Sequence, residues 1–357
     1  MNNTEIKKAI ICKTVKSFQL SAEPNLTYVP KTGDVAVFEV LEIGKHKAIQ
    51  GASGKNIYIF PGDYIMAAFG NRYATNQFEG YVPTRVMNHY QILGQGGCVG
   101  VLHSAHAKLE ALGATQLRLV AYAVQNSGKV INTEFMLDQP IDFDPLKKRN
   151  YEVILSVGSS MDSGKTTSAA YLCRGLKKAG NKVGFIKLTG TVFSKDKRFV
   201  GDCGADKAVD FSNLGFPSTY MYPIETLLQI YETLLNRMEE IEPDYIVVEI
   251  ADGLLQRETS MLLNHSGFMK TVSHIMLSCG DSLGVLSGLT FLDQISRKPF
   301  AISGLINASP LLVEEVKNTI PIPVLNLNDL MSPMVVTRLP KTELVKTNTA
   351  RLSPKVA

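Results

Sequence analysis

The sequence predicts an α/β protein in which a doubly wound, mainly parallel sheet follows a small β-rich domain. From residue 151 onward, short apolar runs alternate with segments of helical periodicity, which is typical of a parallel sheet covered by helices. Before residue 145, short apolar runs are separated by Gly and Pro turns, which indicates a barrel or a sandwich. With 357 residues, the chain is long enough for both domains.

These elements define the expected domains. The β-rich domain, whose role is unknown, spans 1–145, the α/β domain spans 146–335, and a polar, loosely attached tail spans 336–357. The first domain is expected to contain strands at 34–40, 56–60, 64–69 and 117–124 and a helix at 100–112. The second is expected to contain strands at 151–157, 182–188, 244–250, 272–278, 300–306 and 322–326, and helices at 165–179, 224–241, 282–296 and 310–319.

A glycine-rich loop joins the first strand of the α/β domain to its first helix. It reads Gly158-Ser159-Ser160-Met161-Asp162-Ser163-Gly164-Lys165-Thr166-Thr167. Because strand, glycine-rich loop and helix follow one another, the segment is interpreted as a phosphate-binding loop, or P-loop. Its backbone N–H groups would surround the β-phosphate of a nucleoside triphosphate, Lys165 would add positive charge, and the Thr166 hydroxyl would hold Mg²⁺. All ten residues are therefore candidate nucleotide-binding residues.

Three polar residues stand at the carboxyl ends of other predicted strands, where open α/β sheets bind ligands. Lys187 would face the P-loop, or else emerge into solvent. Glu249 ends an apolar strand, where an ionised carboxylate is costly unless it is paired or bound to metal, so it is either a Mg²⁺ ligand or part of a structural ion pair. The amide of Asn307 offers a donor and an acceptor, which suits a purine edge, although a turn before Pro310 would also explain it.

The spacing of the loop resembles a known family. Five residues separate Gly158 from Gly164, one more than usual, as in dethiobiotin synthetase and amidoligase relatives such as cobyrinate a,c-diamide synthase. Segments 187–191 (Lys-Leu-Thr-Gly-Thr), 248–253 (Val-Glu-Ile-Ala-Asp-Gly) and 304–310 (Gly-Leu-Ile-Asn-Ala-Ser-Pro) are similar to that family's motifs and follow the same order. The resemblance covers about residues 150–328 and leaves the β-rich domain unexplained.

The resemblance implies roles for individual residues. Lys187 would contact the γ-phosphate or an acceptor carboxylate, and Glu249 would bind Mg²⁺. Asp162, where the family has a glutamate, would lie near metal and substrate, so Lys165, Lys187 and Asp162 are the candidate catalytic residues. The family's base-recognition segment matches the segment that contains Asn307, so the resemblance implies that Asn307 binds adenine.

A second acidic metal ligand is harder to place. The family carries a metal-binding aspartate after its second strand; Asp202 is the first choice here, and Asp206 is the alternative. Asp252 replaces a glycine of the family, and it is either another acidic group near the metal or a turn residue.

Together these features predict a Mg²⁺-dependent, ATP-binding protein that phosphorylates or activates a small acidic substrate. One alternative is a nucleotide-driven switch or assembly factor, although a second lysine early in the loop, typical of many such proteins, is missing. The other is a polynucleotide-kinase-like or nucleic-acid-binding ATPase. We do not expect nucleic acid as a partner, because segments such as Arg72-Tyr73 and 55–58 give only thin support for a strand-binding surface. A homodimer is a further expectation.

The composition is that of an ordinary globular chain. It is 45% hydrophobic and 20% charged, and its net charge of +4 does not by itself favour a nucleic-acid partner. The sequence contains no apolar run long enough to span a membrane and no signal-peptide core, so no membrane partner is expected. Its five cysteines are scattered without a metal or disulfide pattern. A reduced, cytoplasmic protein is therefore expected.

Overall fold

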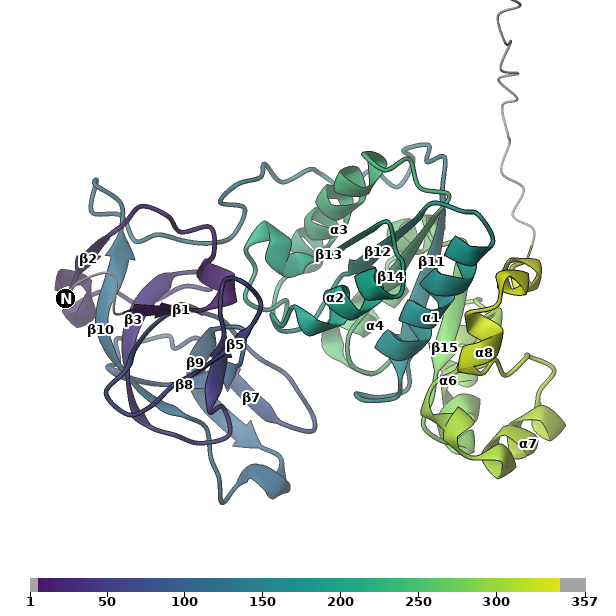
Figure 1. Ribbon diagram of the computed structural model, residues 1–357, viewed down its shortest axis with the longest axis horizontal. Helices are drawn as coiled ribbons and strands as arrows, with labels where there is room; N and C mark the ends of the chain where they lie inside the picture. Colours follow the sequence, from purple (N-terminus) through teal and green to yellow (C-terminus); the bar gives the residue numbers. More distant parts are fainter. Residues whose placement is uncertain (1–5, 341–357) are drawn as a thin grey trace, which may run out of the picture.

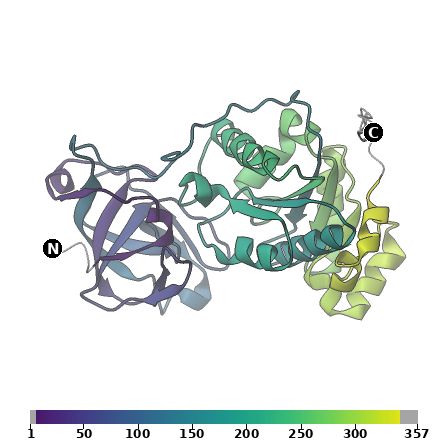
Figure 2. The ribbon, with the colours of Figure 1, turned by 45° about the horizontal axis from the view of Figure 1, so that its top comes forward.

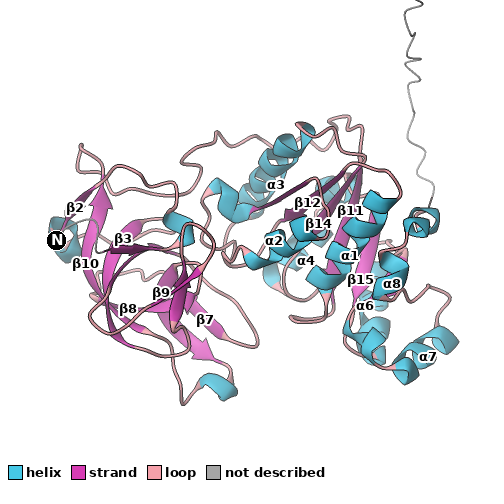
Figure 3. Ribbon diagram, viewed as in Figure 1, coloured by secondary structure: helices cyan, strands magenta, loops and turns pink. Residues whose placement is uncertain are grey.

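The computed structural model of the chain describes residues 6–340 and contains a β-rich domain beside an α/β domain, as predicted (Figure 1). The α/β domain carries helices on both faces of its sheet, whereas the N-terminal domain is built mainly of strands (Figure 3). None of the helices within residues 6–340 has the length and apolar content needed to cross a bilayer.

The N-terminal domain is a closed barrel. Its ring runs β6–β3–β10–β8–β9, and a parallel pairing of β9 with β6 closes it. The strands that build the domain are β1 (Ile6–Lys8), β2 (Gln19–Ser21), β3 (Val35–Glu42), β4 (Ala48–Gln50), β5 (Asn56–Tyr58), β6 (Tyr64–Phe69), β7 (Phe78–Tyr81), β8 (His89–Gly94), β9 (Cys98–Ala105) and β10 (Gln116–Val124).

The predicted helix at 100–112 is wrong. Residues 100–105 belong to β9, and only a 3₁₀ turn at Ala107–Leu109 is helical. β9 pairs with β7 on one side and β8 on the other, so its backbone groups are satisfied by neighbouring strands. Tertiary pairing therefore outweighs the local pattern at this position.

The second domain is a doubly wound sheet of the predicted kind. The order is β13-β12-β14-β11-β15-β16, and all pairings are parallel. The strands are β11 (Glu152–Gly158), β12 (Val183–Lys187), β13 (Lys207–Asp210), β14 (Tyr245–Glu249), β15 (His274–Ser278) and β16 (Ala301–Ser303). The strand expected at 322–326 is reduced to one bridge between Ile302 and Val324, and the polar strand β13 was not predicted.

Helices cover both faces of this sheet because its strands are apolar on both sides. Ile154 of β11 packs in the cluster under α1, whereas Val153 and Leu155 point into the cluster that contains α3. The helices are α1 (Lys165–Lys178), α2 (Lys195–Asp202), α3 (Ile224–Glu239), α4 (Arg257–Asn264), α5 (Ser266–Lys270), α6 (Ser282–Gln294), α7 (Pro310–Thr319) and α8 (Leu327–Leu330). A 3₁₀ helix, η7 (Pro333–Arg338), also packs on α1, so regular structure extends past residue 335; residues 341–357 of the expected tail lie outside the described part.

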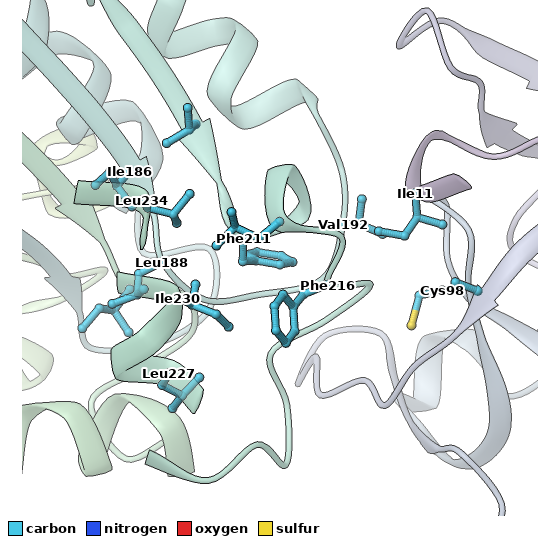
Figure 4. Close-up of a cluster of buried hydrophobic side chains, with 14 of the residues drawn as sticks. Ile11, Cys98, Ile186, Leu188, Val192, Phe211, Phe216, Leu227, Ile230 and Leu234 are labelled. Carbon is cyan, nitrogen blue, oxygen red and sulfur yellow. The ribbon is translucent and has the colours of Figure 1, made fainter. Parts of the chain in front are cut away.

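The two domains share one hydrophobic core. Ile11 and Cys98 of the barrel belong to the same buried cluster as Val192 and Phe216 of the α/β domain (Figure 4). The backbones approach closely at this contact, since a Cβ on Gly96 would lie 2.1 Å from the Val192 carbonyl oxygen. Only glycine fits there, and the barrel is consequently fixed against the edge of the sheet.

The segment between the domains is part of the structure. Residues 132–150 leave the barrel and run along the α/β domain past α3 (Figure 2). Arg237 of α3 donates two hydrogen bonds of 2.6 Å to the carboxylate of Asp138, and Thr233 accepts one of 3.0 Å from the Ile141 N–H. Arg149 pairs with the buried Glu232 at 2.5 Å. These contacts hold the connection along α3.

Candidate functional site

The loop between β11 and α1 has the close packing of a phosphate-binding loop. A Cβ on Gly158 would lie 2.7 Å from the Lys165 side chain, and Gly164 has φ +94°, so both positions require glycine. Lys165 folds back over the loop and donates a hydrogen bond of 2.7 Å to the Ser160 carbonyl. The lysine is buried, and this burial lowers its pKa although Glu249 and Asp252 act in the opposite direction. The ammonium is thus held beside the space that the loop encloses.

Glu249 and Thr166 meet at the start of α1. The Thr166 hydroxyl donates a hydrogen bond of 2.9 Å to Oε1 of Glu249, and the Lys187 ammonium lies 3.1 Å from the same oxygen. Oε2 of Glu249 has no hydrogen-bond partner in the described chain, although the residue is only 1% exposed. A buried carboxylate oxygen without a partner is costly, and a cation bound next to the Thr166 hydroxyl would remove that cost.

The aspartate that reaches this cluster is Asp196. Lys187 forms a second ion pair with Asp196, in the first turn of α2. Burial alone would lower the pKa of Lys187, but Glu249 and Asp196 together raise it, so the ammonium stays charged. Asp202 lies at the exposed C-terminal end of the same helix and does not line the cavity, whereas Asp206 pairs with Lys177 at 2.5 Å. The structure therefore does not bring Asp202 to the site.

These groups line a cavity of about 360 Å³ between the P-loop and the ends of β12 and β14, which we call the phosphate cavity. Asp162 and Asp252 contribute carboxylates, and both have positive φ, +60° and +62°. Such backbone strain in non-glycine residues is often found at ligand sites. Burial raises the pKa of Asp252 against the opposing effect of Lys165. The lining residues are Met161, Asp162, Gly164, Lys165, Thr166, Thr167, Lys187, Asp196, Glu249, Ala251, Asp252 and Leu305.

A second cavity, of about 580 Å³, adjoins the first at Gly164 and Thr167. Its walls include Tyr171 of α1 and Leu327 and Met331 near α8. Asn307 lies in it and donates from Nδ2 to the carbonyls of Leu325 (3.0 Å) and Gly304 (3.3 Å). Its Oδ1 accepts no hydrogen bond from the residues described. The backbone carbonyls thus occupy Nδ2 of the side chain and leave Oδ1 as an acceptor.

The barrel reaches the P-loop, which the sequence did not predict. Asn76 donates a hydrogen bond of 2.8 Å from Nδ2 to Oδ2 of Asp162. Two cationic groups of the barrel lie on the same side. Burial lowers the pKa of Lys45 and of Arg72, and the negative charges of Asp162 and Asp252, respectively, oppose these shifts. The N-terminal domain therefore stands beside the tip of the P-loop, next to the phosphate cavity that Asp162 lines.

The α/β domain has the P-loop NTPase fold. This follows from the glycine-rich loop between β11 and α1, from the neighbouring β14 that carries Glu249, and from the parallel sheet order. The P-loop after β11, Lys187 at the end of β12 and Glu249 at the end of β14 come together as expected. Asn307, beyond β16, lies in the adjoining cavity.

Comparisons with known proteins add little to this description. No family model matches the chain, and no curated protein matches it. Among solved structures it is similar to the signal recognition particle receptor FtsY from Elizabethkingia anophelis in complex with GDP (15% identity, TM-score 0.38), covering 55% of this chain and 66% of that one, just under two thirds. It is also similar to a nucleotide-binding protein in complex with ADP (14%, TM-score 0.33, 53% and 87% covered) and the hydrogenase maturation factor HypB (14%, TM-score 0.30, 47% and 70% covered), both from Archaeoglobus fulgidus. The fold assignment rests on the topology and the loop.

Proposed function

We propose that this protein binds ATP with Mg²⁺ at its P-loop and turns it over at the γ-phosphate. The observation that carries the proposal is the buried Oε2 of Glu249, which has no hydrogen-bond partner among the described residues, whereas Oε1 of the same carboxylate accepts from the Thr166 hydroxyl. Within residues 6–340 no group of three or more His, Cys, Asp or Glu side chains is arranged to hold a metal by itself. A metal at this point would thus depend on phosphate oxygens for its remaining ligands, as Mg²⁺ does in nucleotide sites.

The residues present fit such a complex. Thr166 and Glu249 would hold Mg²⁺, which when bound would neutralise charge on the β- and γ-phosphates. Lys165 would leave the Ser160 carbonyl and bind phosphate oxygens, a stronger charge-assisted partner. Lys187 is kept charged by Glu249 and Asp196 and supplies a second positive charge to the cavity. Catalysis would rest on positioning and charge neutralisation.

Asn307 supports adenine as the base. Both hydrogen bonds from its Nδ2 go to backbone carbonyls, so Oδ1 is left to accept a hydrogen bond from the base. The exocyclic amino group of adenine can donate to that oxygen, whereas O6 of guanine would face it as a second acceptor.

Two more specific functions, a nucleotide-driven switch and phosphoryl transfer, would both use this binding and turnover of ATP. A nucleotide-driven switch is supported by the contact between Asn76 and Asp162, because any movement of the P-loop tip on binding would be transmitted to the barrel. Transfer of the γ-phosphoryl group to a small acidic substrate is supported by the cationic surface of the barrel beside the phosphate cavity. The second function agrees with the resemblance to dethiobiotin synthetase.

Binding and turnover by the full chain test the proposal. We expect saturable ATP binding by calorimetry, tightened by Mg²⁺, and ADP formation that stops when the metal is chelated. Absence of saturable nucleotide binding with and without Mg²⁺ would reject it. ATP labelled in its γ-phosphoryl group separates the finer functions: release as inorganic phosphate without an added acceptor supports the switch, and a requirement for an added carboxylate supports transfer.

A further inference from the structure

A cavity of about 450 Å³ lies between the two domains, with Lys45, His46, Lys47 and Arg72 on its barrel side. The α/β domain contributes 191–193, which follow β12. No Asp or Glu is among its lining residues, so three cationic side chains surround the space without a carboxylate. Small-molecule sites commonly have this volume.

The basic groups of this cavity lack anionic partners within the described part of the chain. Arg72 is 7% exposed, and among the described residues its guanidinium donates hydrogen bonds only to the Leu93 carbonyl and, at 2.7 Å, to the Gln77 amide oxygen. Within residues 6–340 its Nε has no hydrogen-bond partner, and neither has Nδ1 of His46, which is 6% exposed. A buried guanidinium without a carboxylate is costly, because the loss of hydration is not offset by an opposite charge.

Lys45 and Lys47, the other two cationic side chains of the cavity, add positive charge that no carboxylate of its lining balances. Burial and the nearby Arg72 lower the pKa of Lys45 to about 8, against an opposing effect of Asp162. The Lys45 ammonium lies 5.5 Å from the ring centre of Phe78, a weaker partner than an anion. Lys47 is exposed at the mouth of the cavity and forms no ion pair with the residues described. Each of these groups would be stabilised by a bound anion.

The cavity continues toward the phosphate cavity. Thr191 lines it and also lines a narrow recess that contains Ala251 and Asp252. Ala251 and Asp252 in turn line the phosphate cavity. A ligand held by the barrel would therefore lie beside the phosphate cavity, with Thr191, Ala251 and Asp252 between the two.

We propose that this cavity is a binding site for a small organic anion that carries carboxylate or phosphate groups, and we call it the interdomain anion site (Lys45, His46, Lys47 and Arg72). Arg72 and Lys45 would bind the anion directly, and His46 would accept or donate one hydrogen bond through Nδ1. The role of this ligand as the acceptor of the phosphoryl group rests on the proposed function, whereas its binding does not. Through this site, the N-terminal domain would bind an anion next to the nucleotide.

The test measures binding of citrate, and separately of inorganic phosphate, to the full chain by calorimetry. The variant carries Lys45→Met and Lys47→Met; its control carries Lys31→Met and Lys129→Met, the same loss of charge in a separate cavity of the barrel. We expect citrate, phosphate or both to bind at millimolar concentration and the first variant to lose at least about tenfold in affinity, while the control keeps it. Because Lys47 is exposed, Lys47→Met alone should fold normally and show a smaller loss.

Three outcomes overturn the inference. These are absence of saturable binding of both anions, equal affinity in the variant and its control, and binding that is lost in Lys165→Ala but kept in the Lys45/Lys47 variant. The last result would place the anion in the P-loop and leave the proposed function intact. Anion binding that depends on Lys45 and Lys47 in a protein that neither binds nor hydrolyses ATP would reject the proposed function alone.

Discussion

Asn76 of the barrel donates a hydrogen bond of 2.8 Å to Asp162, which lies 86 positions later at the tip of the P-loop. Asp162 adopts φ +60°, a backbone conformation that few non-glycine residues take. The contact links the N-terminal domain directly to the segment that would enclose the phosphates. It makes the barrel part of the candidate nucleotide site.

A double-mutant cycle should detect this link in ATP affinity. Asn76→Ala leaves Asp162 without its donor next to the phosphates, so we expect ATP binding to weaken by about 0.5–1.5 kcal/mol. In a protein that already carries Asp162→Ala, the same change should have little effect. Calorimetry on the wild type, the two single variants and the double variant gives the coupling free energy between Asn76 and Asp162 in ATP binding. If the two effects simply add, the contact does not act on the nucleotide.

Lys165→Ala should abolish ATP turnover and leave the fold intact. The ammonium lies over the loop, where it donates to the Ser160 carbonyl, and its alkyl chain can be removed without breaking a helix. Turnover and ATP affinity are measured beside the thermal unfolding curve. Lys178→Ala, at the C-terminal end of the same helix, is the matched control and should behave as the wild type. Unchanged turnover in Lys165→Ala would remove the central claim.

Glu249→Gln should separate nucleotide binding from metal dependence. It keeps the size of the side chain but removes the charge that would hold Mg²⁺ beside Thr166. ATP binding without metal should be unchanged or tighter, since repulsion of the phosphates falls. Mg²⁺-dependent turnover should fall by about 10²-fold or more. The measurement is turnover against Mg²⁺ concentration; a wild-type curve would show that Glu249 serves only the ion pair with Lys187.

Asn307→Ala should reduce selection of the base. Loss of Oδ1 leaves the amino group of adenine without its acceptor, so ATP affinity should fall by about 1–3 kcal/mol while GTP affinity changes less. Competition of unlabelled ATP, GTP and CTP against a fluorescent ATP analogue measures this. Asn328, which lines the same cavity, gives a control variant, Asn328→Ala, with a smaller expected effect. Equal affinity of the wild type for all three nucleotides would mean that no such selection exists.

Glu134 should make stability depend on pH. Burial raises its pKa to about 7, although a hydrogen bond from Tyr222 across the domain contact acts in the opposite direction. Below pH 4.5 the carboxyl is protonated in both folded and unfolded chains, and its stabilising contribution is complete. As the pH rises through about 7 the folded protein must ionise a buried group, and that contribution is lost.

Glu134→Gln removes this ionisation. Its melting temperature relative to the wild type should therefore increase between pH 4.5 and pH 8, and thermal unfolding at several pH values measures the difference. Glu110→Gln, at an exposed position of the barrel, is the control. A difference that stays constant with pH would show that Glu134 does not titrate in this range.

The sheet and most of the P-loop site could be predicted because local patterns determine them. Buried parallel strands appear in a sequence as apolar runs. Their carboxyl ends bring Lys187 and Glu249 together, and in the structure Nζ of Lys187 lies 3.1 Å from Oε1 of Glu249. Asp196 escaped prediction because it follows an irregular segment whose length fixes no spacing from β12. Asn76 and Arg72 escaped because their positions depend on how the barrel docks, which no local pattern encodes.

The packing of Ile11, Val192 and Phe216 in one cluster restricts how the two domains can move. Opening like a hinge would expose these side chains to water, whereas sliding of one packed surface over the other would keep them covered. The close approach of Gly96 to the Val192 carbonyl leaves room only for small displacements. Any movement that the nucleotide transmits to the barrel should therefore be a small shear along this packed surface, with no opening between the domains.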